Sequence, residues 1–422
     1  SITVDGEVTV DGTSGSSIYV VEGSDVMFNG WVTATGDNVI YGDGNITFNG
    51  KITTSITDPA TGTVYVGTIN MGNKSVVTYS AEAGEAGSVL ELFSGVYGAL
   101  VVNREAVING KVTLNTSLSG NGKVTFAGET LGNGTVKATE DGKKINVVYE
   151  NAATTVYAGD YGDLTIKGDH TVAGADEKNT VTVTVEGAIT ITGADGTGAA
   201  TLKLDNANLK IGNGAINNTD YARIEASNNS TVTYEYSGNR DRAIYSGIYR
   251  TLEINSSGLG SQVVDALTVQ TALTGQGGLV IQGSIAGTGS VVGGKIDVTY
   301  GEAIIEGFLG GSYHNLILNG SGTKTFGSNL TVSGRFQAAG STLLGNGNLT
   351  FNGEIVGSAT FGTAEQAYQG HVIYGLNEGT RAQTVFGGNY TTLEFTGNEK
   401  SIAENLTVAE LTTKADITIK SG

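Results

Sequence analysis

Acidic residues are the side chains of this sequence that could carry out catalysis. Asp160 and Asp163 lie three residues apart, and Asp241 stands between Arg240 and Arg242. Carboxylates that converge in a cleft beside an arginine are the groups that cleave glycosidic bonds in polysaccharides. Most other acids alternate with apolar residues, as the outward face of a strand does. We therefore interpret the acids as solvated surface charges and predict no catalytic residue, with a carbohydrate-active enzyme as the alternative.

Histidines and cysteines offer no pattern for a metal site. The three histidines, His170, His314 and His371, stand in no recognisable catalytic or metal-binding motif. No His-Glu-x-x-His segment occurs, and without cysteine the chain has no thiolate ligand. The sequence therefore predicts no metal site and no cofactor.

Four segments share the spacing Gly-x-Gly-x-apolar-x-apolar-x-Gly. They are YGDGNITFNG (41–50), SGNGKVTFAG (119–128), TGQGGLVIQG (274–283) and LGNGNLTFNG (344–353). In a phosphate-binding loop such glycines open a helix, so that backbone N–H groups converge on the anion. Here they open a stretch with period-two alternation, which indicates a strand. We therefore interpret them as turn residues that supply positive φ between strands.

The elements that position these residues are short strands. Glycine accounts for 66 residues and proline for one, and small apolar centres recur every five to eight residues, which predicts strands of three to five residues. A parallel β-helix has three such strands in each coil of roughly twenty residues, and coils stack at about 4.8 Å. The sequence predicts an all-β fold: one continuous right-handed parallel β-helix, or β-solenoid, over residues 1–422. Its inward positions should include Val124, Phe126, Leu349 and Phe351.

A longer repeat with the pattern Gly-x-Tyr-x-x-Leu-x-apolar overlies the short one. It occurs at 95–102, 159–166, 247–254, 311–318 and 388–395. A second tyrosine precedes each unit by 12 to 18 residues, at the end of a strand pattern. Tandem immunoglobulin-like β-sandwiches, one for each tyrosine unit, are the alternative fold. The repeated tyrosines either stack on a ligand or cover the base of the variable loops with their hydroxyls at the surface: Tyr97, Tyr161, Tyr249, Tyr313 and Tyr390.

Charge and the start of the chain bear on location. The net charge of −18 argues against binding to nucleic acid or anionic membranes. No run of 18 apolar residues occurs, so we expect no membrane insertion. Because a strand pattern starts directly at Ser1, we interpret the chain as mature after signal-peptide removal, and we expect it to be extracellular or on the cell surface.

Asn-x-Ser/Thr sites are frequent. Thirteen are present, and they are glycan acceptors in a host with the machinery and corner residues otherwise. They are Asn45, Asn73, Asn115, Asn133, Asn217, Asn228, Asn229, Asn255, Asn319, Asn329, Asn348, Asn389 and Asn405.

Segments such as YHNLILNGSGTKTFGSNLTVSG (313–334) resemble the β-helical stalks of prokaryotic surface proteins. Autotransporter passengers and filamentous-haemagglutinin-type adhesins share this pattern, which extends over nearly the whole chain. The Asn-Pro turns of two-partner secretion are missing, since the only proline is Pro59. The resemblance implies a non-enzymatic structural or adhesive protein, with cell-surface glycans as one class of partner.

Both ends of the sequence keep the strand pattern. The chain begins SITVDGEVTVDG (1–12) and finishes LTTKADITIKSG (411–422). An end coil without a cap exposes unpaired N–H and C=O groups, which another strand can pair with. We therefore expect copies of the chain to join head to tail as a filament. The joint should bury Ile2, Val4, Ile417 and Ile419. The alternative is that the sequence is part of a longer stalk, whose neighbouring coils cover both ends.

Overall fold

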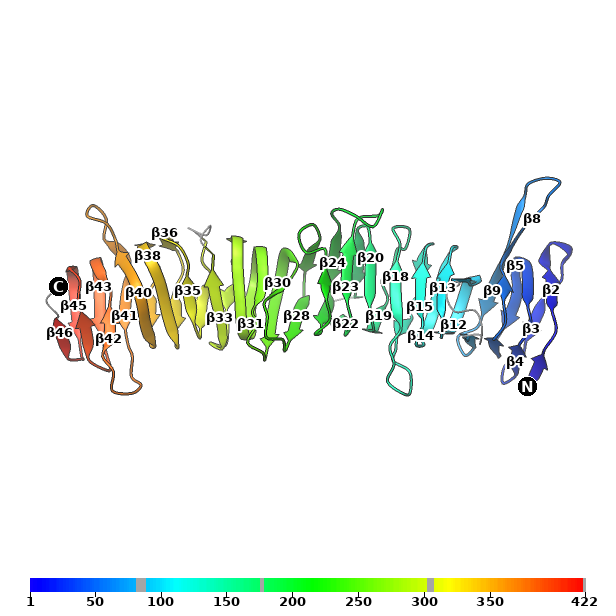
Figure 1. The fold of residues 1–422 in the computed structure, drawn as a ribbon, viewed down its shortest axis with the longest axis horizontal. Helices are drawn as coiled ribbons and strands as arrows, with labels where there is room; N and C mark the ends of the chain where they lie inside the picture. Colours follow the sequence, from blue (N-terminus) through cyan, green and yellow to red (C-terminus); the bar gives the residue numbers. More distant parts are fainter. Residues whose placement is uncertain (81–88, 175–177, 302–306, 420–422) are drawn as a thin grey trace. The chain divides into compact units, whose positions relative to one another are not determined.

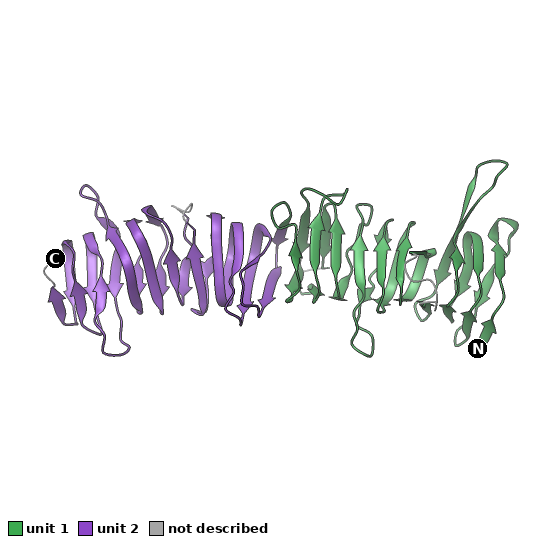
Figure 2. Ribbon diagram, viewed as in Figure 1, with its two compact units in different colours: residues 1–223 green, residues 224–422 purple. Residues whose placement is uncertain are grey.

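The computed structural model describes residues 1–80, 89–174, 178–301 and 307–419. In this part of the chain, parallel strands stack as a β-solenoid of about 20 turns. Its one short helical turn is η1 (Gly12–Ser14), of the 3-10 type, and no α-helix occurs among these residues. The chain groups into two compact units, residues 1–223 and 224–422 (Figure 2). Each unit has its own stack of strands and its own buried core.

Alternation of apolar and polar residues determines which side chains lie inside. In β15 (Lys123–Phe126) and β39 (Leu349–Phe351), every second side chain is apolar and buried. Burying a side chain of this size contributes about 1.5–3 kcal/mol before conformational entropy is counted. Four residues predicted to point inward are at most 1% exposed, which confirms the prediction: Val124, Phe126, Leu349 and Phe351.

In unit 1, strands of successive coils pair in register, so equivalent side chains stack. The strands β4 (Asp25–Phe28), β6 (Asn45–Phe48) and β10 (Val76–Tyr79) lie side by side in parallel (Figure 1). The ring of Phe48 lies between those of Phe28 and Tyr79, with centroids 5.5 and 5.0 Å away. This aromatic column fills the interior, and stacking adds to the effect of burial.

One hairpin departs from the parallel stack of unit 1. The strand β8 (Ser55–Thr57) pairs antiparallel with the start of β9 (Val64–Met71), and the two project as an arm (Figure 1). The rest of β9 returns to the stack, where it pairs in parallel with β5 (Val32–Gly42) and β12 (Ser94–Val102). The arm is therefore an insertion into one coil.

In unit 2 several strands are longer than the sequence predicted. The strand β30 (Ser246–Ser256) pairs in parallel with β31 (Gln262–Ala286), which has 25 residues and pairs onward with β33 (Ile296–Tyr300). The strands β38 (Arg335–Gly345) and β40 (Glu354–Phe361) are also longer than predicted, and they pair in parallel with each other. The expectation of strands of three to five residues is wrong for these, because the ladder of backbone hydrogen bonds continues through the corners.

Glycines form those corners, as predicted. The first glycine of each Gly-x-Gly segment has a positive φ: Gly42 (128°), Gly120 (131°), Gly275 (109°) and Gly345 (126°). A Cβ at any of them would also collide with a carbonyl oxygen of the preceding coil. Only glycine combines this φ with so close a backbone approach.

The parallel pairing excludes the alternative fold. Immunoglobulin-like sandwiches need antiparallel strands and a separate core in each domain. Strands one coil apart instead pair in parallel in both units, and the core side chains stack from coil to coil. The parallel β-solenoid is confirmed, and its continuity over residues 1–422 stays a prediction.

Candidate functional site

Ten tyrosines of the repeated units lie inside the solenoid as five pairs. In each pair the hydroxyl oxygens are 3.0–3.2 Å apart: Tyr79–Tyr97, Tyr149–Tyr161, Tyr234–Tyr249, Tyr300–Tyr313 and Tyr374–Tyr390. All ten residues are at most 2% exposed, so no external ligand can stack on their rings. The expected ligand face is therefore wrong, and so is the expectation that its hydroxyls reach the surface: Tyr97, Tyr161, Tyr249, Tyr313 and Tyr390.

Each pair holds a single backbone residue that lies four positions before its second tyrosine. In unit 2 the Leu309 N–H donates to Tyr300 Oη (3.3 Å), and Tyr313 Oη donates to the Leu309 carbonyl (2.5 Å). Since Tyr313 has one proton to donate, the hydroxyl of Tyr300 is the donor between the two tyrosines. The hydrogen bonds form a closed cycle through one residue. We call the two tyrosines and this residue the tyrosine clasp.

The other units repeat the clasp. Tyr157 and Phe386 each donate their N–H to the first tyrosine and accept from the second. Phe93 and Tyr245 accept from the second tyrosine at the same spacing. All five held residues lie just outside a strand and so are not part of the ladder of backbone hydrogen bonds. A buried peptide group without a partner costs about 1–3 kcal/mol, and the clasp supplies hydrogen bonds to these peptide groups in place of the ladder.

A glycine two positions after the held residue completes the clasp. These glycines are Gly95, Gly159, Gly247, Gly311 and Gly388, and a Cβ at each would collide with a carbonyl oxygen of the preceding coil. The sequence signature is therefore apolar-small-Gly-x-Tyr, as in Phe-Ser-Gly-Val-Tyr (93–97) and Leu-Gly-Gly-Ser-Tyr (309–313). Its role is structural: it returns the chain to the stack after a variable loop.

The acidic candidates are bound to the backbone of neighbouring coils. Asp163 Oδ1 accepts the Ala188 N–H (2.7 Å), and Asp241 Oδ1 accepts the Ser261 N–H (2.9 Å). Asp160 lies half-buried on β19 (Ala158–Tyr161), where its register partner is Thr184. Each of these contacts joins one coil to the next.

The two arginines beside Asp241 lie on the same loop. Arg242 packs over the Tyr236 ring at 4.4 Å and donates from Nε to Gln262 Oε1 (3.2 Å). The carbonyl of Arg240 accepts the Tyr236 hydroxyl (2.7 Å). Tyr236 therefore holds the loop against its own coil, and Arg242 also links it to the following coil.

Asparagines at the corners make the same kind of link between coils. Asn315 Oδ1 accepts the Arg335 N–H (2.6 Å), and Asn329 Oδ1 accepts the Asn348 N–H (2.8 Å). Asn348 Oδ1 in turn accepts the His371 N–H (3.0 Å). A side-chain oxygen at a corner thus satisfies an N–H that the turn removes from the ladder.

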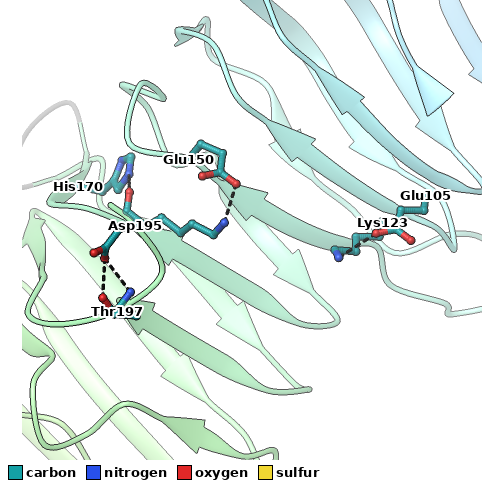
Figure 3. Close-up of polar contacts among 7 residues, drawn as sticks. Glu105, Lys123, Glu150, His170, Asp195 and Thr197 are labelled. Carbon is teal, nitrogen blue, oxygen red and sulfur yellow. Dashed lines mark hydrogen bonds and ion pairs between the residues drawn. The ribbon is translucent and has the colours of Figure 1, made fainter. Parts of the chain in front are cut away.

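The histidines also form contacts within the stack. Buried His170 lies with Nε2 2.9 Å from the Lys167 carbonyl, and Lys167 pairs with Glu150 at 2.8 Å (Figure 3). His314 Nδ1 lies 2.7 Å from the Asp297 carboxylate, and His371 Nε2 lies 3.3 Å from that of Glu394. Among the described residues no group of three or more potential ligands could hold a metal ion.

Ion pairs on the outer face also join one coil to the next. Lys123 and Glu105 are register partners one coil apart, and Lys123 Nζ lies 2.9 Å from Glu105 Oε1 (Figure 3). Asp195 closes a turn instead, because its Oδ1 accepts both the N–H and the hydroxyl of Thr197 at 2.8 Å. Exposed pairs of this kind contribute little individually, about 0–1 kcal/mol.

Both units have hollows on the surface that are large enough to hold a small molecule. A groove of about 530 Å³ in unit 2 is lined by residues that include Glu354, Glu378 and Arg381, with Arg381 Nη1 3.0 Å from Glu354 Oε1. A hollow of about 320 Å³ in unit 1 is lined by residues that include Asp37, Asn38 and Tyr41. The sequence analysis identified neither of them.

The asparagines of the glycosylation sites all lie outside the core. None of the thirteen is buried, and eight of them are exposed. Some amide groups already have partners: Asn45 Nδ2 donates to Asp25 (3.0 Å), and Asn217 Nδ2 donates to Thr190 (2.9 Å). At these two positions one amide hydrogen is already engaged, so the exposed Asn73 and Asn133 are better placed acceptors.

Lys400 is a buried cation in the last coils of unit 2. Its side chain is inaccessible, and Nζ donates to the Asn398 carbonyl (2.6 Å). Burial lowers the pKa of Lys400 from 10.5 to about 8. The cation is therefore less stable here than in the unfolded chain, because burial removes its hydration.

Replacing Lys400 with methionine is expected to stabilise unit 2 at neutral pH by about 1–2 kcal/mol, since no charge is then buried. In the unmodified chain stability should rise between about pH 8 and 10, because the folded state releases its proton before the unfolded state does. Urea denaturation at a series of pH values measures both effects. The exposed Lys414 serves as the control, and Lys414→Met should change neither. A Lys400→Met variant that is less stable at pH 7 would contradict the prediction.

Among the residues that the structure describes, no helix is long and apolar enough to cross a bilayer. No protein-family model, curated protein or solved structure matches the chain.

Proposed function

We propose that the protein is a non-enzymatic structural or adhesive protein of the cell surface, whose copies join head to tail as an extracellular filament. The observation that carries this proposal is the exposure of strand edges at the two end coils. These coils expose apolar side chains on strand edges, whereas most strands between them bury every second residue.

The first coil of unit 1 has such an edge. The strand β1 (Ile2–Val4) pairs in parallel with β4 on one side, and Ile2 is 62% exposed while Val4 is half-buried. A further strand in the same register would pair with the other side of β1 and cover Ile2.

The last described coil of unit 2 has a similar edge. The strand β46 (Ile417–Ile419) pairs in parallel with β44 (Lys400–Ile402), and Ile417 and Ile419 are exposed. In β45 (Leu406–Thr413) the alternation of buried residues stops, and Leu411 is exposed as well. Copies that stack end to end would satisfy both edges by the pairing already used inside each unit.

Other features support a structural rather than a catalytic role. The tyrosine pairs, the corner asparagines and two of the candidate acids, Asp163 and Asp241, bind backbone groups of their own or neighbouring coils. The thirteen surface asparagines, the net charge of −18 and the resemblance to surface-protein stalks favour an exported location. With this charge we expect no partnership with nucleic acid and no membrane insertion.

Electron microscopy and light scattering of the purified chain test the filament. We expect filaments from the intact chain and none from a version without residues 1–12 or from Ile2→Asp, because a charge at the joint would be buried without a partner. Leu259→Asp is the matched control: Leu259 is 89% exposed but lies away from both edges, so filaments should persist. Single, monodisperse particles from the intact chain at high concentration would overturn the proposal.

A carbohydrate-active enzyme is the second candidate, and one observation favours it. The groove of unit 2 has the acids Glu354 and Glu378 beside Arg381. Such an enzyme would release reducing ends from a panel of polysaccharides, and Glu354→Gln would abolish the release. That result would replace the structural proposal, whereas no turnover on the panel supports it.

A further inference from the structure

Two exposed tyrosines lie side by side on the outer face of unit 1. Tyr19 on β3 (Ile18–Val20) and Tyr41 on β5 are register partners in adjacent coils, with ring centroids 5.1 Å apart and planes tilted by 35°. Tyr19 is 58% exposed and Tyr41 37% exposed. The paired tyrosines of the clasps are all buried, whereas this pair is exposed to solvent. At this distance and tilt the two rings are stacked with an offset, and the parts of both rings that stay exposed form an aromatic platform open to solvent.

A polar hollow adjoins the platform. Tyr41 is one wall of the hollow of about 320 Å³, and Asp37, Asn38, Asn70 and Ser16 are among its other lining residues. Asn70 is the register partner of Tyr41 in the following coil. In the part of the chain described, the side chains of Asp37 and Asn70 make no hydrogen bond or ion pair within the protein. These groups are therefore available to a ligand.

The backbone fixes this arrangement. Asn38 has a positive φ of 53°, and its N–H donates to Thr68 Oγ1 (2.8 Å). Gly36 has a φ of 103° at the same corner, where a Cβ would collide with Gly12. The corner thus holds Asp37 and Asn38 next to Tyr41 before any ligand arrives, which reduces the entropy that binding must overcome.

We propose that the Tyr19–Tyr41 platform and this hollow form a binding site for a neutral sugar ring. A pyranose has an apolar face of C–H groups and a rim of hydroxyls. Its face matches the platform, and its rim matches amide, carboxylate and hydroxyl groups that can donate or accept hydrogen bonds. Sites with aromatic walls and a few fixed polar groups are the usual form of small-ligand sites, and about 320 Å³ lies at the lower end of their volumes.

Charge and ring geometry distinguish this ligand from others. An acidic sugar would approach Asp37 on a chain with a net charge of −18, which disfavours it. A quaternary ammonium ion binds best where aromatic faces surround it. Two rings with centroids 5.1 Å apart and planes tilted by 35° are stacked on each other, so they do not surround a cation. A neutral sugar fits both observations.

Saturation-transfer NMR on the full chain tests the site, with methyl glycosides of glucose, galactose and mannose as neutral probes and with sialic acid and choline as charged probes. We expect transfer to the C–H protons of at least one neutral glycoside. Tyr41→Ala and Tyr19→Ala should each weaken its binding about tenfold, because they remove half of the platform. Tyr19→Phe keeps the ring and should stay within about twofold of the unmodified chain.

Tyr221→Ala is the control, since Tyr221 is also exposed in unit 1 but lies outside the hollow, and it should leave binding unchanged. The proposal is overturned if no neutral glycoside receives saturation, if Tyr41→Ala binds as the unmodified chain does, or if choline binds at the two tyrosines in preference to the glycosides. The inference rests on the proposed surface role but not on filament formation. Filaments without sugar binding would overturn the site and leave the filament proposal standing.

Discussion

Raising the pH from about 10 to about 12 is expected to unfold the solenoid cooperatively, because its buried tyrosines must stay protonated. Of the 18 tyrosines, five reach solvent, which leaves 13 in the interior. The five are Tyr19, Tyr41, Tyr65, Tyr221 and Tyr236. Burial raises the pKa of Tyr300 to about 12, and it raises the pKa of Tyr313 well above the usual value of 10. The other clasps show upward shifts with the same main cause.

The sign of the effect follows from proton binding. Below about pH 10 both the folded and the unfolded chain keep these protons, so the tyrosines contribute fully to stability. Above that pH the unfolded chain loses them while the folded chain retains them, and stability falls through the raised pKa values. For Tyr300 alone, whose pKa is about 12, the loss amounts to a few kcal/mol by about pH 12. Because burial also raises the pKa of the other nine clasp tyrosines, the total exceeds the stability of ordinary domains.

Tyrosinate absorbance and circular dichroism, followed together during alkaline titration, measure this effect. We expect ionisation of the thirteen interior tyrosines to coincide with loss of the β signal. Tyr65→Phe and Tyr221→Phe are controls that should leave the pH of this transition unchanged, because both residues lie outside the interior. Reversible titration of all 18 tyrosines with the β signal intact would contradict the assigned burial.

Inward positions could be predicted from the sequence wherever a strand is straight. In Lys123–Phe126 and Leu349–Phe351, alternation with a period of two places valine, leucine and phenylalanine inside, and the preceding glycines mark the corners. Both follow from local chemistry, namely side-chain polarity and backbone sterics. The same two signals are sufficient to identify the parallel β-solenoid.

The orientation of the repeated tyrosines could not be predicted in this way. Tyr97 and Leu100 are three positions apart, so strict alternation would place them on opposite faces. Both are nevertheless fully buried, because the register shifts between Tyr97 and Ala99 as the strand turns a corner. The same shift lies between Tyr249 and Thr251. A corner inside a strand reverses the alternation of inward and outward side chains. The position of that corner cannot be predicted from the sequence.

The Tyr19–Tyr41 platform was missed for a related reason. The two tyrosines are 22 positions apart and share no motif, and they meet because β3 and β5 pair in register. Register between coils depends on the length of the corner at residues 36–38, where a glycine and an asparagine adopt positive φ. Sites made across coils are therefore visible only once the stack is known.

Removing one hydroxyl from a clasp is expected to destabilise unit 2 by about 1–3 kcal/mol. In Tyr313→Phe the Leu309 carbonyl loses its donor and the Tyr300 hydroxyl loses its acceptor, both in the fully buried interior. In Tyr300→Phe the Leu309 N–H loses its acceptor. Neither change alters packing much, because phenylalanine keeps the ring. Urea denaturation gives the total loss, and amide exchange at Leu309 shows whether the opening is local.

Tyr236→Phe is the matched control for the clasp. Its hydroxyl also donates to a carbonyl, that of Arg240 at 2.7 Å, but at a site that water can reach. Water replaces the lost bond there, so the expected loss is about 0.5 kcal/mol or less. An equal loss in Tyr313→Phe and Tyr236→Phe would show that the clasp hydroxyls are not isolated from water.

The double variant Tyr300→Phe/Tyr313→Phe tests whether the clasp acts as one unit. The two single changes together strand three groups: the Tyr300 hydroxyl, the Leu309 carbonyl and the Leu309 N–H. The double change strands only the last two, because the Tyr300 hydroxyl is then absent. Its cost should therefore be smaller than the sum of the single costs by about 1 kcal/mol. Strict additivity would mean that the tyrosines bind Leu309 independently. The closed cycle of hydrogen bonds would then add no stability beyond that of its separate bonds.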